Sequence, residues 1–170
     1  MRKFVTIVFS LLVFAACKKD PPIDSSQSLA ERIPGTWNVI GIQYNGVAPN
    51  PFDTTEILAF SGTGKNVNGY FHFEKDTNLG EFDISFIAEA SLGIGAPISY
   101  NAITKRSGFY EILNDDQIVR MTNFAGDSVY DWEVRVNQPK KQTWFVTMYH
   151  DWGFAGLDSV PINVEATMTR

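Results

Sequence analysis

The sequence predicts an all-β fold, an up-and-down antiparallel barrel of eight to ten strands with one short N-terminal helix. Apolar and polar residues alternate with period two over most of the chain after residue 35, which is typical of strands with one buried face. Short links rich in Asn, Asp, Gly and Pro separate these segments. Closing the sheet into a barrel removes edge strands, which would otherwise invite aggregation.

Composition excludes several classes of protein. Hydrophobic residues make up 44% of the 170 residues, which is a globular rather than a disordered composition. A net charge of −5 argues against a nucleic-acid partner, because such proteins carry a basic surface. The single cysteine excludes a disulfide scaffold and cysteine-based zinc or iron–sulfur sites. The two histidines, His72 and His150, lack the spacing of zinc ligands, so we expect no metal and no cofactor.

The sequence contains no catalytic motif that would indicate an enzyme. The nucleophile pattern G-x-S-x-G is absent, and residues 61–65 (SGTGK) do not complete a phosphate-binding loop. We therefore expect a protein that is not an enzyme. A weaker alternative is a hydrolase whose site surrounds His150.

Residues 1–16 predict a bacterial export signal. Arg2 and Lys3 precede an uncharged run, 4–16, that is shorter than the about 20 residues of a spanning helix. The following residues Phe14-Ala15-Ala16-Cys17 resemble the lipobox of bacterial lipoproteins. That resemblance implies cleavage before Cys17 and attachment of lipid to its sulfur. The alternative is an ordinary secretory signal followed by an incidental cysteine.

Residues 17–27 are predicted to be the lipidated cysteine and a flexible tether, because this stretch is rich in Pro, Ser and charge. The barrel domain then occupies residues 28–170. An acidic domain is not attracted to an anionic bilayer, so the lipid would hold the protein at the membrane. Cys17 is followed by Lys18-Lys19-Asp20 and not directly by the aspartate that favours inner-membrane retention. We therefore expect a lipid-anchored location at the outer membrane, on either face.

The elements follow from local signals in chain order. Ser28 and Glu31 have the spacing of a capping box, and Pro34-Gly35 ends the helix, so a short helix is predicted at 28–33. Strands are predicted at 36–44, 56–61, 69–75, 80–90, 97–105, 108–113, 117–123, 129–137, 142–150 and 159–169.

Six links in this series carry turn chemistry. Asn45-Gly46 and Asn68-Gly69 are the strongest hairpin pairs, because type I′ turns favour Asn-Gly. Residues 61–65 are also interpreted as a hairpin turn. Further turns are predicted at 114–116, 125–127 and 137–140.

Residues 33–39 (IPGTWNV) follow the predicted helix and open the first strand. They resemble the start of lipocalin-like (calycin) domains, in which the Trp of a Gly-x-Trp motif plugs the closed end of an eight-stranded barrel. The resemblance implies this role for Gly35 and Trp37. It also implies that Arg170, which shares parity with the apolar face of strand 159–169, lies over Trp37. With the lipobox, the whole resembles lipocalin-like lipoproteins of the bacterial outer envelope.

Aromatic residues, 14% of the chain, are the strongest indication of function. An eight-stranded barrel either holds one small ligand or fills itself with side chains. Many inward rings therefore favour a small or absent cavity. Seven rings are predicted to point inward: Phe71, Phe73, Phe82, Phe86, Tyr130, Trp132 and Trp144.

A Gly-rich segment after strand 142–150 is predicted to form the rim of the barrel. In it, Trp152 would supply an apolar contact and His150 a polar one, with Phe154, Tyr130 and Trp132 completing a ligand-binding set. The alternative is that the segment plugs the barrel mouth. Two functions remain open: a binding module for a small apolar or amphipathic ligand, or a structural or inhibitory module that contacts another envelope protein.

Overall fold

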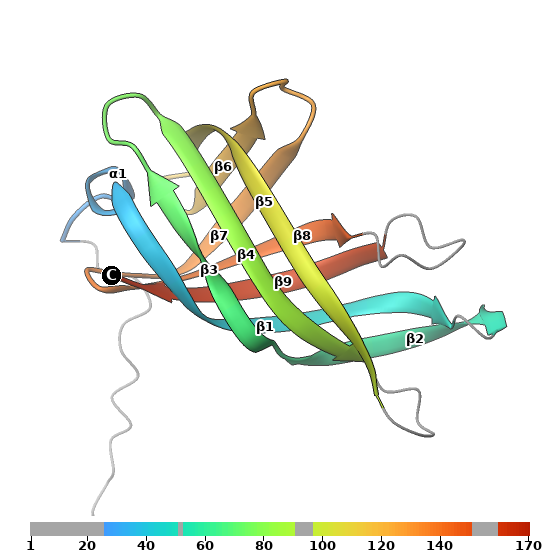
Figure 1. Cartoon of the computed structure of the whole chain (residues 1–170). Coiled ribbons are helices and arrows are strands. Elements are labelled where there is room, and N and C mark those ends of the chain that lie inside the picture. The colour runs from blue at the N-terminus through green and yellow to red at the C-terminus, as the bar shows by residue number, and fades with distance from the viewer. Residues whose placement is uncertain (1–25, 51–52, 91–96, 151–159) are drawn as a thin grey trace, which may run out of the picture.

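The computed structural model describes residues 26–50, 53–90, 97–150 and 160–170. The predicted signal, Cys17 and all but the end of the predicted tether lie outside these residues. The described chain confirms the all-β prediction: nine antiparallel strands form one sheet, which closes by pairing of β1 with β9 (Figure 1). The barrel has eight strands and one extra strand.

From β3 onward the strands follow one another in the sheet in chain order. β2 and β3 both pair with the same edge of β1. β3 pairs with residues 35–38 of β1 and β2 with residues 43–50, so these two strands together occupy one place in the barrel. The elements are α1 Leu29–Arg32, β1 Gly35–Asn50, β2 Asp53–Thr63, β3 Lys65–Phe73, β4 Leu79–Ala90, β5 Ile98–Leu113, β6 Ile118–Asn123, β7 Val129–Gln138, β8 Lys141–His150 and β9 Val160–Thr169.

The predicted capping box is present at the start of α1. The Ser28 hydroxyl accepts the Glu31 backbone N–H, and the Glu31 carboxylate accepts the Ser28 N–H, both at 3.3 Å. The Leu29 N–H donates to the Asp116 carboxylate at 2.7 Å, which ties the helix to the turn between β5 and β6. Leu29 and Ile33 are fully buried, so the helix covers one end of the core.

Three sequence-based turn predictions are wrong. Asn45-Gly46 lies inside β1 and Asn68-Gly69 lies inside β3. Residues 61–65 contain the end of β2, Gly64 and the start of β3, and these two strands pair with β1 and not with each other. A Cβ at Gly46 would lie 2.6 Å from the Phe60 ring and 2.9 Å from the Pro161 carbonyl oxygen. Glycine therefore occurs here because neighbouring groups approach the backbone closely, and not because the chain turns.

The predicted strands 97–105 and 108–113 are also one continuous strand, β5. Gly108 lies at the point where β6 begins to pair, opposite Asn123. A Cβ on Gly108 would collide with the Thr122 carbonyl oxygen and lie 2.7 Å from the Asn123 Cα. Glycine at this position thus permits close contact between neighbouring strands.

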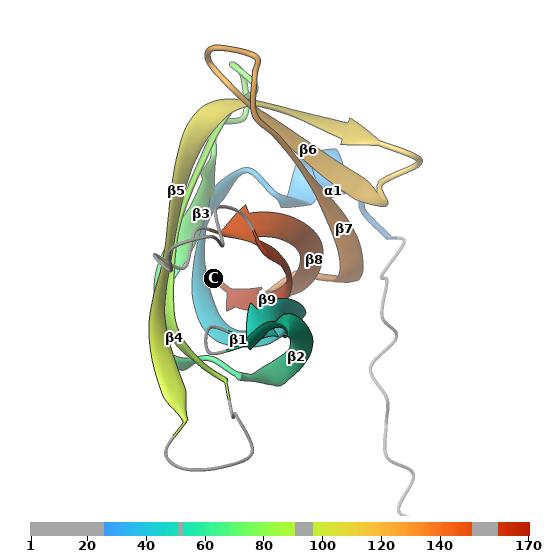
Figure 2. The same ribbon diagram turned by 90° about the vertical axis from the view of Figure 1, so that its right-hand side faces the viewer.

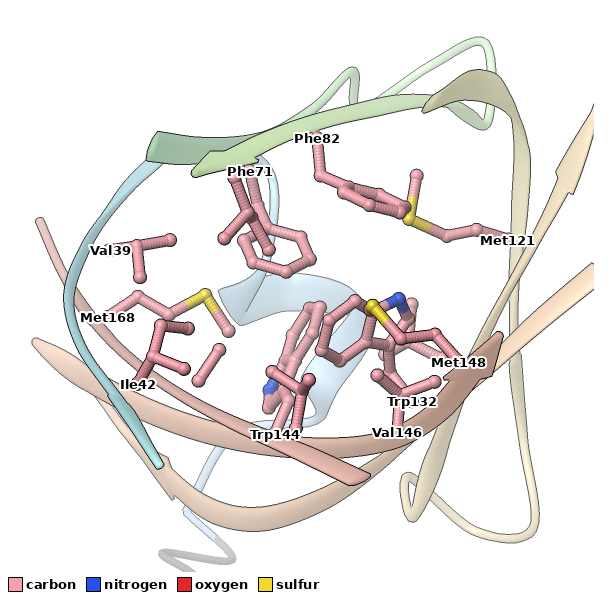
Figure 3. Close-up of a cluster of buried hydrophobic side chains, with 14 of the residues drawn as sticks. Val39, Ile42, Phe71, Phe82, Met121, Trp132, Trp144, Val146, Met148 and Met168 are labelled. Atoms are coloured by element: carbon pink, nitrogen blue, oxygen red, sulfur yellow. The ribbon is translucent and has the colours of Figure 1, made fainter. Parts of the chain in front are cut away.

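Inward-facing aromatic rings make up much of the barrel core. Of the seven predicted inward aromatic residues, six are buried and Tyr130 is half-buried. The Phe71 ring lies edge-on to Trp132 and Trp144, with centroids 5.0 and 5.3 Å apart (Figure 3). This packing confirms the prediction that aromatic rings occupy much of the barrel interior.

Candidate functional site

The end of the barrel near α1 is closed by Trp37. Its fully buried indole donates an N–H hydrogen bond to the Ile33 carbonyl at 2.9 Å. The Arg170 guanidinium lies 4.7 Å from the Trp37 ring centroid and donates to the Pro34 and Pro139 carbonyls at 3.3 Å. The expected contact between Arg170 and Trp37 is present. Arg170 is exposed, however, and covers the ring from outside the core instead of lying within it.

On another side the barrel wall is split between β5 and β8. Among the described residues, 98–107 of β5 pair only with β4, and 146–150 of β8 pair only with β9. The ladder between β7 and β8 begins at Glu133–Phe145, while residues 129–132 of β7 pair only with β6. Figure 2 looks at this side, with β5 and β7 on either side of β8 and β9.

The inward side chains beside this split are apolar or weakly polar. Ala102 of β5 is buried opposite Phe86, and Met148 of β8 is also buried. The Thr104 hydroxyl donates to the Met148 sulfur at 3.8 Å, a contact that joins the two separated strands. A Thr hydroxyl and a Met sulfur form a weak hydrogen bond, so this contact adds little to the wall.

A cation and a phenol mark the outer part of the split. The Arg106 guanidinium lies 5.6 Å from the Tyr130 ring centroid and donates to the Lys105 carbonyl at 2.7 Å. Tyr130 in turn lies edge-on to the buried Phe82, with centroids 5.7 Å apart. The region thus passes from an exposed cation through a half-buried ring to an apolar interior.

Trp132 carries a buried polar group at this place. It is fully buried, and its indole N–H has no hydrogen-bond partner in the described part of the chain. Leaving such a donor unsatisfied costs about 1–3 kcal/mol. Native proteins satisfy most buried donors, so an exception calls for an explanation.

The structure brings together only part of the predicted ligand-binding set. Tyr130 and Trp132 face the split from β7. The His150 backbone pairs with Val160 at the end of β8, and the His150 side chain is not among those described. Trp152 and Phe154 lie outside the described residues, so their predicted rim position stays a prediction.

Sequence reasoning missed Arg106, Thr104 and Met148 as residues of the split. Arg106 shares its parity with Ala102 and Thr104, and would have been placed on the inward face if β5 had been recognised as one strand. Met148 shares its parity with Trp144 in strand 142–150, which places it on the inward face. Nothing in the sequence showed that the wall opens beside it, because strand pairing depends on distant residues.

Apart from the split, a hollow lies on the outer face of β3, β4 and β5. It has a volume of about 410 Å³ and is lined in part by His72, Glu81 and Ser107. His72 Nδ1 lies 2.8 Å from the Thr36 hydroxyl, and the hydrogen bond from the Tyr70 hydroxyl to Glu81 raises the pKa of Tyr70. No hydrogen bond joins Ser107 to His72 among the described contacts, so these two residues do not form the nucleophile–base pair of a hydrolase.

Exposed aromatic side chains border this outer hollow. Phe109 and Phe124 are 52% and 62% exposed, and their rings meet edge-on with centroids 5.4 Å apart. Val129, which is 51% exposed, pairs with Thr122, which pairs in turn with Phe109. These three side chains, Phe109, Phe124 and Val129, form what we call the outer aromatic patch.

Comparison of the sequence with protein-family models and with curated proteins finds no match. In the part of the chain that the structure describes, no helix has the length and apolar character needed to cross a membrane. The described residues also contain no group of three or more side chains arranged to hold a metal ion.

Proposed function

We propose that this protein is a lipid-anchored binding protein of the bacterial outer envelope, which holds a small apolar or amphipathic ligand at the open end of its barrel. The split wall carries this proposal. Unpaired strand edges are normally covered, and here they border buried Ala102 and Met148. Pockets at the mouths of β-barrels are common ligand sites, and their linings are mostly apolar.

The packing at the closed end supports the resemblance to lipocalin-like domains. Gly35 opens β1 with a φ of 109°, and Trp37 and Arg170 make the contact that the resemblance implies. Buried rings lie next to this contact, and a second group of buried rings lies farther along β1, β2 and β4: Tyr44, Phe60 and Phe86. A core filled in this way leaves room for a short amphipathic molecule rather than a bulky one.

Cys17 is proposed to be the anchor, and its replacement tests this part of the proposal. Cys17→Ser should move the protein from the membrane fraction to the soluble fraction, because the acyl chains provide the membrane affinity. The measurement is fractionation of cells expressing each form, with a high-salt wash. Retention of Cys17→Ser in the washed membranes would contradict the lipid anchor.

A second candidate function, contact with another envelope protein, is favoured by the outer aromatic patch. Exposed aromatic side chains in contact with one another are typical of protein interaction sites. Phe109 and Phe124 are exposed on the outer face of the sheet, whereas Ala102 and Met148 are buried on its inner face, so the two functions would use different faces of the barrel wall.

Matched substitutions separate the two functions. Ala102→Phe places a ring beside Phe86 and should weaken binding of the methyl ester of a dansylated fatty acid at least about tenfold, which is about 1.4 kcal/mol. Ile103→Phe is the control, because Ile103 is adjacent in β5 and 64% exposed. Phe124→Ser should leave binding of this ester unchanged and should remove any envelope protein that crosslinks to the native chain.

Equal affinity for the dansylated ester in the native protein and in Ala102→Phe would refute the ligand site. Overpacking costs about 1–3 kcal/mol, so urea unfolding of each variant must show that it is still folded. Loss of a protein crosslink in Phe124→Ser, with no binding of the dansylated ester by any form, would favour the interaction module instead.

A further inference from the structure

Three tryptophans are fully buried in the described chain, and their indole N–H groups differ. Trp37 donates to the Ile33 carbonyl at 2.9 Å, and Trp144 donates to the Gln142 side-chain oxygen at 3.1 Å. The Trp132 N–H has no partner among the described residues. The core therefore supplies hydrogen-bond acceptors to the indoles of Trp37 and Trp144. It supplies none to the indole of Trp132.

The surroundings of Trp132 contain apolar groups rather than acceptors. Its ring lies edge-on to Phe71 and Phe82, with centroids 5.0 and 5.5 Å apart. Figure 3 shows Trp132 beside Val146 and Met148. None of these side chains offers a strong hydrogen-bond acceptor, which accounts for the unpaired indole N–H of Trp132.

Trp132 also lies at the point where the barrel wall divides. β7 and β8 pair Val134 with Trp144 and Glu133 with Phe145, and the ladder stops there. Continuing this register would place Trp132 opposite Val146. The unsatisfied donor is thus the first inward residue beyond the last pair.

Flexible side chains border the same place. Met148 comes from β8 and Met121 from β6, and both are buried (Figure 3). Methionine side chains adapt their shape easily and are common at surfaces that accept varied apolar ligands. They can therefore move aside for a molecule that enters between β5 and β8.

We propose that the Trp132 indole N–H is the hydrogen-bond donor to a neutral carbonyl oxygen, such as that of an ester, amide or ketone, on the apolar ligand of this barrel. The inference rests on the proposed ligand-binding function and assigns the ligand's polar group. A carboxylate fits poorly, because burying an ion without a partner is costly. The cation of the split, Arg106, lies at its outer part against Tyr130.

The test uses methyl decanoate, decane and decanoate as probes for the full-length protein labelled with ¹⁵N at its indoles. Methyl decanoate should shift the Trp132 N–H resonance and slow its hydrogen exchange, while decane should leave both unchanged. Trp132→Phe keeps an aromatic ring but removes the donor. It should lower the affinity for methyl decanoate about tenfold, equivalent to about 1.4 kcal/mol, and should leave decane binding unchanged. Decanoate should bind more weakly than the ester.

Trp144→Phe is the matched control, because it removes an N–H that already has an acceptor. It should reduce stability more than Trp132→Phe and should keep the preference for ester over decane. Equal binding of ester and decane with an unmoved Trp132 resonance would overturn the inference and leave the ligand site standing. Failure of all three probes and of the dansylated ester would overturn the proposed function and the inference together.

Discussion

Trp37→Ala is expected to lower the free energy of unfolding by about 3–5 kcal/mol, the usual range for removing a large aromatic side chain from a core. Trp37 is fully buried at the closed end, and its N–H donates to Ile33. The substitution leaves a cavity beneath Arg170 and an Ile33 carbonyl without its donor. Urea unfolding, followed by circular dichroism, measures the change.

Ile40→Ala provides the control for this measurement. Ile40 lies in the same strand as Trp37 but is 59% exposed, so its replacement should change stability by less than about 0.5 kcal/mol. A loss below about 1 kcal/mol for Trp37→Ala would show that the indole does not close the core. The contact with Arg170 would then be a surface feature.

Gly108→Ala is expected to be destabilising by about 3 kcal/mol, the upper part of the usual range for overpacking. The added methyl group would collide with the Thr122 carbonyl oxygen and approach the Asn123 Cα to 2.7 Å. Both obstacles are backbone atoms, so β5 and β6 must separate to make room. Urea unfolding gives the loss of stability, and hydrogen exchange should be faster at the amides of β6.

Gly41→Ala is the matched control within the same barrel. A Cβ at Gly41 meets no atom within 4 Å, and its backbone is not in the left-handed region. The alanine should therefore be neutral or stabilising by up to about 1 kcal/mol, because it restricts the unfolded chain. Similar urea midpoints for the two variants would contradict the steric role of Gly108.

Part of the candidate site was predictable from the sequence. Tyr130 and Trp132 alternate with charged residues along one segment, and this pattern alone assigned both to the inward face. The state of the Trp132 N–H was not predictable. The acceptor of Trp37 lies four residues away in the chain and that of Trp144 two residues away, but whether Trp132 meets an acceptor depends on what other strands bring to it.

The sequence by itself determined the faces of the strands and the start of the helix, because both depend on residues within a few positions of one another. The pleat sends alternate side chains to opposite sides, and Ser28 and Glu31 complete their capping box locally. Only the tertiary structure decided the role of Gly46 and Gly108, because the groups that approach them belong to other strands. It also decided where the wall divides, since the length of each ladder depends on how far its two strands stay side by side around the curved barrel.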